Sequence, residues 1–160
     1  VRRFTMATGD IKWFPEALLN LGKKVHNLSS DTLKLGIVTT ATVPALNTAD
    51  PHWGGSGTTN FATSEVSTGG GYTGPITLAS VTWTNVSNVP MLRAADVTIP
   101  QNASGFSNGA YGIIFNDTDA NKRAIGWIEL SFEGTLSIVS GSRTIDFQGA
   151  GTDVLKITQS

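Results

Sequence analysis

Apolar and polar residues are arranged in short runs along most of the chain, a pattern that predicts strands rather than long helices. Residues 32–40 alternate, with Leu33, Leu35 and Ile37 on one side of the predicted strand. The runs at 111–115 and 124–132 are almost continuously apolar, which is typical of strands buried on both faces. Further strands are expected at 76–86, 96–100, 135–139, 143–147 and 153–158, giving about eight in all.

One short helix is predicted near the N-terminus. Phe14, Leu18, Leu21 and Val25 have the spacing of a single helical face. Pro15 suits the first turn of a helix, where its missing N–H costs nothing. The pattern therefore indicates one amphipathic helix before the first strand.

The order of these elements indicates an all-β fold. Closely spaced strands without helical crossovers favour an antiparallel sandwich or barrel over a parallel sheet. Residues 1–12 are expected to form an extended arm, and residues 13–160 a single domain. Within that domain, residues 41–75 show little strand pattern, and a loop of this length is usually functional or ordered by a partner.

Composition narrows the function classes. The chain of 160 residues is 39% hydrophobic but only 14% charged, whereas about 25% is usual, and it contains 18 glycines. A disordered chain or a coiled coil would be richer in charge. The net charge of −1 provides no basic field for nucleic acid, no apolar run is long enough to span a membrane, and the lack of cysteine removes thiol chemistry.

The residues carry no recognisable catalytic motif. His26 and His52 are the only histidines, and no nucleophile elbow, zinc-binding helix or phosphate-binding loop occurs. Glu129 and Glu133 are the best candidates for the paired carboxylates of a glycosidase, but both are expected to face solvent. We therefore expect no enzyme activity, no cofactor and no metal.

Residues 116–122 contain the beginning of a calcium-loop pattern. Asp117, Asp119 and Asn121 have the spacing of the first three ligands. Lys122 replaces the required glycine, and Ile128 replaces the bidentate glutamate. The sequence therefore predicts a polar hairpin loop that binds no calcium.

Aromatic and basic residues outside the strand patterns are candidates for partner contacts. Trp53 lies in a glycine-rich loop, where it either anchors the loop on its own domain or contacts a partner. The basic and aromatic N-terminal arm could become ordered on a neighbouring subunit. Trp83 and Trp127 follow strand patterns and are expected in the core. The contact candidates are Arg2, Arg3, Phe4, Lys12, Trp13, His52, Trp53 and Tyr72.

Several motifs, taken in order, resemble the head decoration (cement) proteins of tailed bacteriophages. They are Glu16-Ala17-Leu18-Leu19, the segment 28–39, Gly71-Tyr72, Val81-Thr82-Trp83, the segment 111–118 and the segment 124–129. The resemblance covers nearly all of the chain after Trp13 and consists of strand and turn residues. The long loop at 41–75 and the basic arm depart from the shorter members of that family.

The resemblance implies a jellyroll-like β-sandwich on the outer face of a virion capsid. The implied partners are the major capsid protein and further copies of the chain, as a homotrimer in preference to a homodimer. It implies no enzyme activity, no cofactor, no direct contact with nucleic acid and no membrane. The alternatives are a glycan- or receptor-binding module of a phage fibre or tail, and a neck or tail component.

Overall fold

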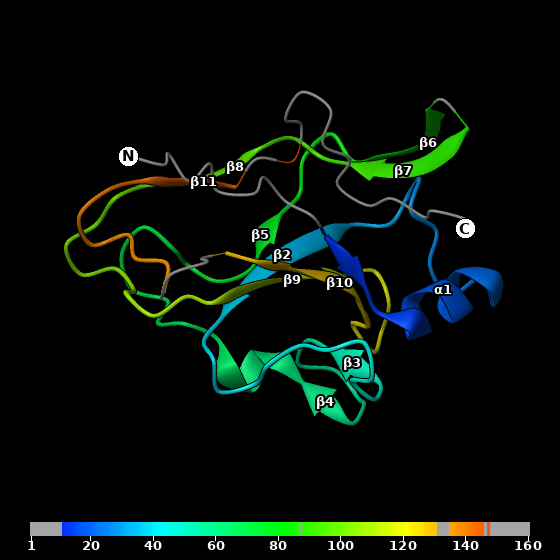
Figure 1. Ribbon diagram of the computed structural model, residues 1–160, viewed down its shortest axis with the longest axis horizontal. Helices are drawn as coiled ribbons and strands as arrows, with labels where there is room; N and C mark the ends of the chain where they lie inside the picture. Colours follow the sequence, from blue (N-terminus) through cyan, green and yellow to red (C-terminus); the bar gives the residue numbers. More distant parts are fainter. Residues whose placement is uncertain (1–10, 87, 131–134, 146, 148–160) are drawn as a thin grey trace, which may run out of the picture.

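The computed structural model (Figure 1) describes residues 11–86, 88–130, 135–145 and 147. This part of the chain is mostly strand, with one α-helix and one short 3₁₀ helix. In chain order the elements are β1 (Lys12–Trp13), α1 (Pro15–Gly22), β2 (Leu33–Val38), β3 (Pro51–His52), β4 (Thr59–Asn60), η1 (Phe61–Ser64), β5 (Ile76–Thr77), β6 (Thr82–Val86), β7 (Val89–Arg93), β8 (Val97–Ile99), β9 (Tyr111–Asn116), β10 (Ala124–Glu129) and β11 (Arg143–Ile145).

A five-stranded antiparallel sheet forms the centre of the fold. Its strand order is β1-β10-β9-β2-β5. The register places Leu35 beside Ile114 and Trp127 beside Ile113. Almost every residue of the three inner strands is buried, as the apolar runs predict for a sheet covered on both faces.

Different segments cover the two faces of this sheet. Figure 1 shows β3, β4 and η1 on one side, and β8, β11, β6 and β7 on the other. Among the described residues this second side consists of two-stranded antiparallel sheets, β8–β11 and β6–β7. The fold is thus strand-rich and layered, and its strands pair antiparallel except β3 and β4, which are parallel.

Helix α1 is shorter than its apolar pattern suggests. It ends at Gly22, and Lys24 takes a left-handed φ of 61°. The chain turns there, so Val25 does not extend the helical face. Ala17 and the preceding Phe14 are buried and Leu21 is partly buried against the core, whereas Leu18 is 39% exposed. The prediction that Leu18 lies on the buried face is therefore wrong, because the helix packs against β10 through its smaller Ala17 side.

Two predicted strands differ in the structure, and one strand was not predicted. The run at 76–86 is split into β5 and β6, and Ser80 has a φ of 52° between them. Strand β7 was not predicted, because Pro90 lies inside it and lacks a backbone donor. Residues 135–139 form only an isolated bridge between Leu136 and Gly109. The strand predicted at 153–158 and the end of the 124–132 run lie outside the described residues.

The segment 41–75 packs against the rest of its own chain. It contains β3, β4 and η1 and buries aromatic side chains beneath it. The Asn60 side chain also accepts hydrogen bonds from the backbone N–H groups of Gly54 (2.8 Å) and Ala62 (3.0 Å). Buried anchors and a side-chain cap order this loop within the chain itself, so a partner is not needed to order it, and a functional role for the loop stays a prediction.

Candidate functional site

Trp53 is an anchor of the segment 41–75. Its ring stacks on Phe115 of β9 at a centroid distance of 5.2 Å and an interplanar angle of 2°. It lies directly over Gly36 of β2, where no side chain intervenes. Its backbone N–H donates to the carbonyl of Lys122 at 2.9 Å. Of the two roles considered for Trp53, the structure shows the anchor.

His52 and Tyr72 are also buried. His52 is 2% exposed, and its Nδ1 lies 3.2 Å from the carbonyl oxygen of Asp50. The Tyr72 hydroxyl accepts from the backbone N–H of Ile37 (3.1 Å) and donates to Glu65 Oε1 (2.8 Å). The prediction of partner contacts is therefore wrong for His52, Trp53 and Tyr72, because their aromatic surface is used inside the domain.

The Tyr72 hydroxyl satisfies a backbone donor on β2 beyond the end of the short strand β5. Burial raises the pKa of Tyr72 well above its ordinary value, so the hydroxyl remains neutral and able to donate. Tyr72→Phe would leave the N–H of Ile37 buried without a partner. We expect a loss of about 1–3 kcal/mol in the free energy of unfolding, measured by denaturant titration.

The matched control for this substitution is Tyr111→Phe. Tyr111 packs partly buried against the core, and its hydroxyl makes no hydrogen bond within the described part of the chain. It should cost less than about 0.5 kcal/mol. Equal losses for the two variants would contradict a specific role for the Tyr72 hydroxyl.

Two of the N-terminal contact candidates, Lys12 and Trp13, are described, and both lie in β1. Lys12 pairs β1 with β10 through Glu129, with Nζ and Oε1 2.8 Å apart on the surface. Trp13 is half-buried and meets Trp83 edge-to-face at 6.1 Å. Trp127 is buried as predicted, while Trp83 is only partly buried against the core. Arg2, Arg3 and Phe4 lie outside the described residues, as does Glu133.

The loop between β9 and β10 is the predicted polar hairpin. Asp117 pairs with Lys122 at 2.6 Å and with Lys34 at 2.9 Å. These lysines, Lys122 foremost, lower the pKa of Asp117 below its usual range. Asp119 pairs with Arg123 at 3.0 Å. Among the described residues, no group of three or more acidic or histidine side chains is arranged to hold a metal ion.

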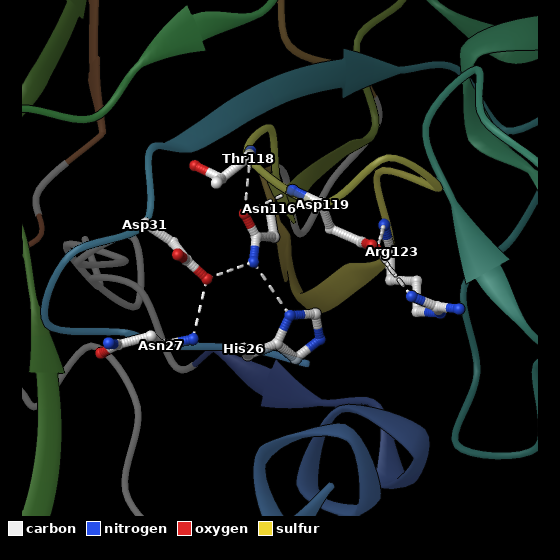
Figure 2. A network of polar contacts seen from close by, with 7 residues as sticks. All are labelled: His26, Asn27, Asp31, Asn116, Thr118, Asp119 and Arg123. Carbon is white, nitrogen blue, oxygen red and sulfur yellow. Dashed lines mark hydrogen bonds and ion pairs between the residues drawn. The ribbon is translucent and has the colours of Figure 1, made fainter. Parts of the chain in front are cut away.

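Beneath this hairpin lies a buried polar network centred on Asn116 (Figure 2). The Asn116 Nδ2 atom lies 2.6 Å from Asp31 Oδ2 and 3.0 Å from His26 Nδ1. Its Oδ1 accepts from the backbone N–H groups of Thr118 (2.9 Å) and Asp119 (3.2 Å). All four hydrogen-bonding positions of the Asn116 amide are therefore occupied.

This network joins two segments that are distant in sequence. One is the connection between α1 and β2 at residues 23–32, and the other is the hairpin loop at 117–123. Backbone contacts reinforce the junction, because Thr32 N–H donates to Thr118 Oγ1 (2.9 Å) and Asp117 N–H donates to the carbonyl of Thr32 (2.8 Å). The sequence gives no local signal for it, since His26 and Asn116 are separated by 90 positions.

Within the described part of the chain, four large apolar side chains are exposed. They occur on α1, as Leu18 and Leu19 (61% exposed), and in the segment 43–46, as Val43 and Leu46 (66% exposed). Helix α1 contacts the same loop, because Glu16 accepts from the backbone N–H of Asp50, which follows that segment, at 3.0 Å. These residues were not predicted as contact candidates, because Leu18 was assigned to the apolar face of the helix and the others follow no strand or helix pattern.

Comparisons with known proteins identify no relative of this chain. No protein-family model, no curated protein and no solved structure matches it. No described helix has the length and apolar character needed to cross a bilayer.

Proposed function

We propose that this chain is a structural virion protein that binds the outer face of a tailed-phage capsid and bridges major capsid protein subunits. The motif order of strands and turns described above supports the proposal. We further propose that the complete domain is a jellyroll-like sandwich and that it acts as a homotrimer without cofactor or catalytic activity.

The observation that carries the proposal is that nearly all described carboxylates are engaged within the fold, while exposed apolar side chains remain on the surface. The described carboxylates other than Asp50 all serve as acceptors or ion-pair partners within the fold. They are Glu16, Asp31, Glu65, Asp96, Asp117, Asp119 and Glu129. Such side chains hold elements together, and exposed apolar groups on α1 and the segment 43–46 remain for contact with a protein surface.

A bridging protein needs many modest contacts rather than one strong site. Several copies in one oligomer bind a repeating shell with gains in avidity that no single contact provides. The ordered segment 41–75 suits this role, because a preformed surface loses little conformational entropy on docking.

Electron cryomicroscopy of purified virions tests this function directly. We expect density for the chain on the outer face of the shell, between capsid subunits. Density in a neck ring, in the tail or at a fibre tip would contradict the proposal and would support the alternatives. Purified chain that binds glycans but not capsids would likewise overturn it.

Surface variants test which residues make the contact. Leu19→Glu and Leu46→Glu place a charge on exposed positions, so each should change the free energy of unfolding by less than about 0.5 kcal/mol. Each should reduce capsid occupancy at least about tenfold, because a charge would be desolvated in the interface. Thr84→Glu, on the exposed side of β6, is the control and should leave occupancy unchanged.

A further inference from the structure

The hydrogen bonds around Asn116 allow only one arrangement of protons. Two backbone N–H groups point at Oδ1, which fixes the amide orientation, and Nδ2 therefore donates to both Asp31 and His26. His26 Nδ1 must accept, so the ring carries its proton on Nε2. That atom is buried without a partner in the described residues, and the side chain is only 4% exposed.

Adding a proton to His26 conflicts with this arrangement. Protonated Nδ1 would be a donor facing the donor Nδ2 of Asn116. Rotating the Asn116 amide does not relieve the conflict, because Nδ2 would then face the N–H groups of Thr118 and Asp119. The same rotation would turn Oδ1 toward the carboxylate of Asp31. No rotation of the amide satisfies the network once His26 is charged.

We propose that the His26–Asn116–Asp31 network is an acid-sensitive latch that holds the connection 23–32 against the hairpin loop 117–123, and that protonation of His26 opens it. Figure 2 shows both segments converging on the Asn116 amide. Opening releases the Thr32 contacts to Asp117 and Thr118 and uncovers Leu28, which is buried in the closed form.

The charged groups facing His26 act in opposite directions. Burial lowers the pKa of His26 below its ordinary value of 6.5, and Arg123 lowers it further. The carboxylates of Asp119 and Asp31 raise the pKa but do not outweigh burial. Because the closed form has the lower pKa, its stability is fully present above about pH 6.5 and falls as the pH drops toward the pKa of the closed form.

Amide hydrogen exchange on the full chain tests the latch. Between about pH 7.5 and about pH 5, after correction for intrinsic exchange, opening of 23–32 and 117–123 should increase up to roughly thirtyfold, because the open His26 takes up a proton. This window lies above the range in which carboxylates ordinarily titrate. Exchange in β9 and β10 should change much less.

Two asparagine variants separate the latch from general acid sensitivity. In His26→Asn the amide oxygen is attached at the same position as Nδ1 and accepts from Asn116 without titrating, so the pH-dependent opening should disappear. In His52→Asn it should persist, because His52 lies in the segment 41–75 and His26 is unchanged. Equal pH responses in wild type and His26→Asn would overturn the proposal.

A measurement on the unaltered protein covers the case in which His26→Asn does not fold. Nitrogen-15 NMR of the two imidazoles should show His26 with its proton on Nε2 at neutral pH. Its protonation should coincide with exchange opening of 23–32. Protonation of His26 without that opening, or a neutral ring with the proton on Nδ1, would contradict the latch.

Discussion

Gly36→Ala is expected to destabilise the fold more than any other single methyl group added to the described sheet. A Cβ at this position of β2 would overlap the ring of Trp53. The ring cannot move aside without losing its stack on Phe115 and opening a gap in the core. We expect a loss of at least about 3 kcal/mol in the free energy of unfolding, measured by denaturant titration.

The control is the same substitution in open space. Gly22→Ala at the end of α1 meets no atom within 4 Å. It should be neutral or stabilise by up to about 1 kcal/mol, because alanine suits a helix better than glycine. In Gly36→Ala combined with Trp53→Ala, the two losses should fall well short of additive. Full additivity would show that the contact between position 36 and Trp53 does not cause the effect.

Asn116→Ala should produce the second large loss. It removes four side-chain hydrogen bonds at once and leaves the carboxylate of Asp31 and two backbone N–H groups without this partner. We expect about 2–3 kcal/mol, because the hydrogen bonds of the buried amide are lost while the groups that it leaves behind are only partly buried. Thermal and denaturant unfolding measure this loss.

Asn85→Ala is the surface control for this substitution. Asn85 is exposed on β6, and its replacement should cost less than about 0.5 kcal/mol. A loss below about 1 kcal/mol for Asn116→Ala would mean that water replaces the amide, and that the network does not hold the hairpin in place.

The central strands could be predicted from the sequence because their signal is local. The apolar runs of β2, β9 and β10 need no knowledge of their partners, since a strand covered on both faces is apolar throughout. Strand β7 was not predicted, and the reason is also local. Proline is unfavourable inside most strands, but Pro90 lies in a two-stranded sheet, where both strands are edge strands.

The role of the segment 41–75 could not be predicted in the same way. Trp53 in a glycine-rich loop has the same local pattern whether it packs inward or outward. Gly36 determines that the ring packs inward, because the missing side chain leaves room for Trp53 on β2. This glycine lies 17 positions earlier in the chain. The polar network could not be predicted for the same reason. His26 and Asn116 follow no local motif, and they become hydrogen-bond partners only through the folding of the sheet.

The pairing of β2 with β9 has a consequence for synthesis of the chain. Residues 33–38 find their partner only at residues 111–116, and β10 follows at 124–129. On the ribosome, the N-terminal apolar strand therefore emerges long before the strands that cover its edge. Closing so long a loop carries a large entropic cost, so the sheet should assemble late and slowly. We therefore expect the nascent chain to expose an unpaired, aggregation-prone apolar strand until residues 111–129 have been synthesised.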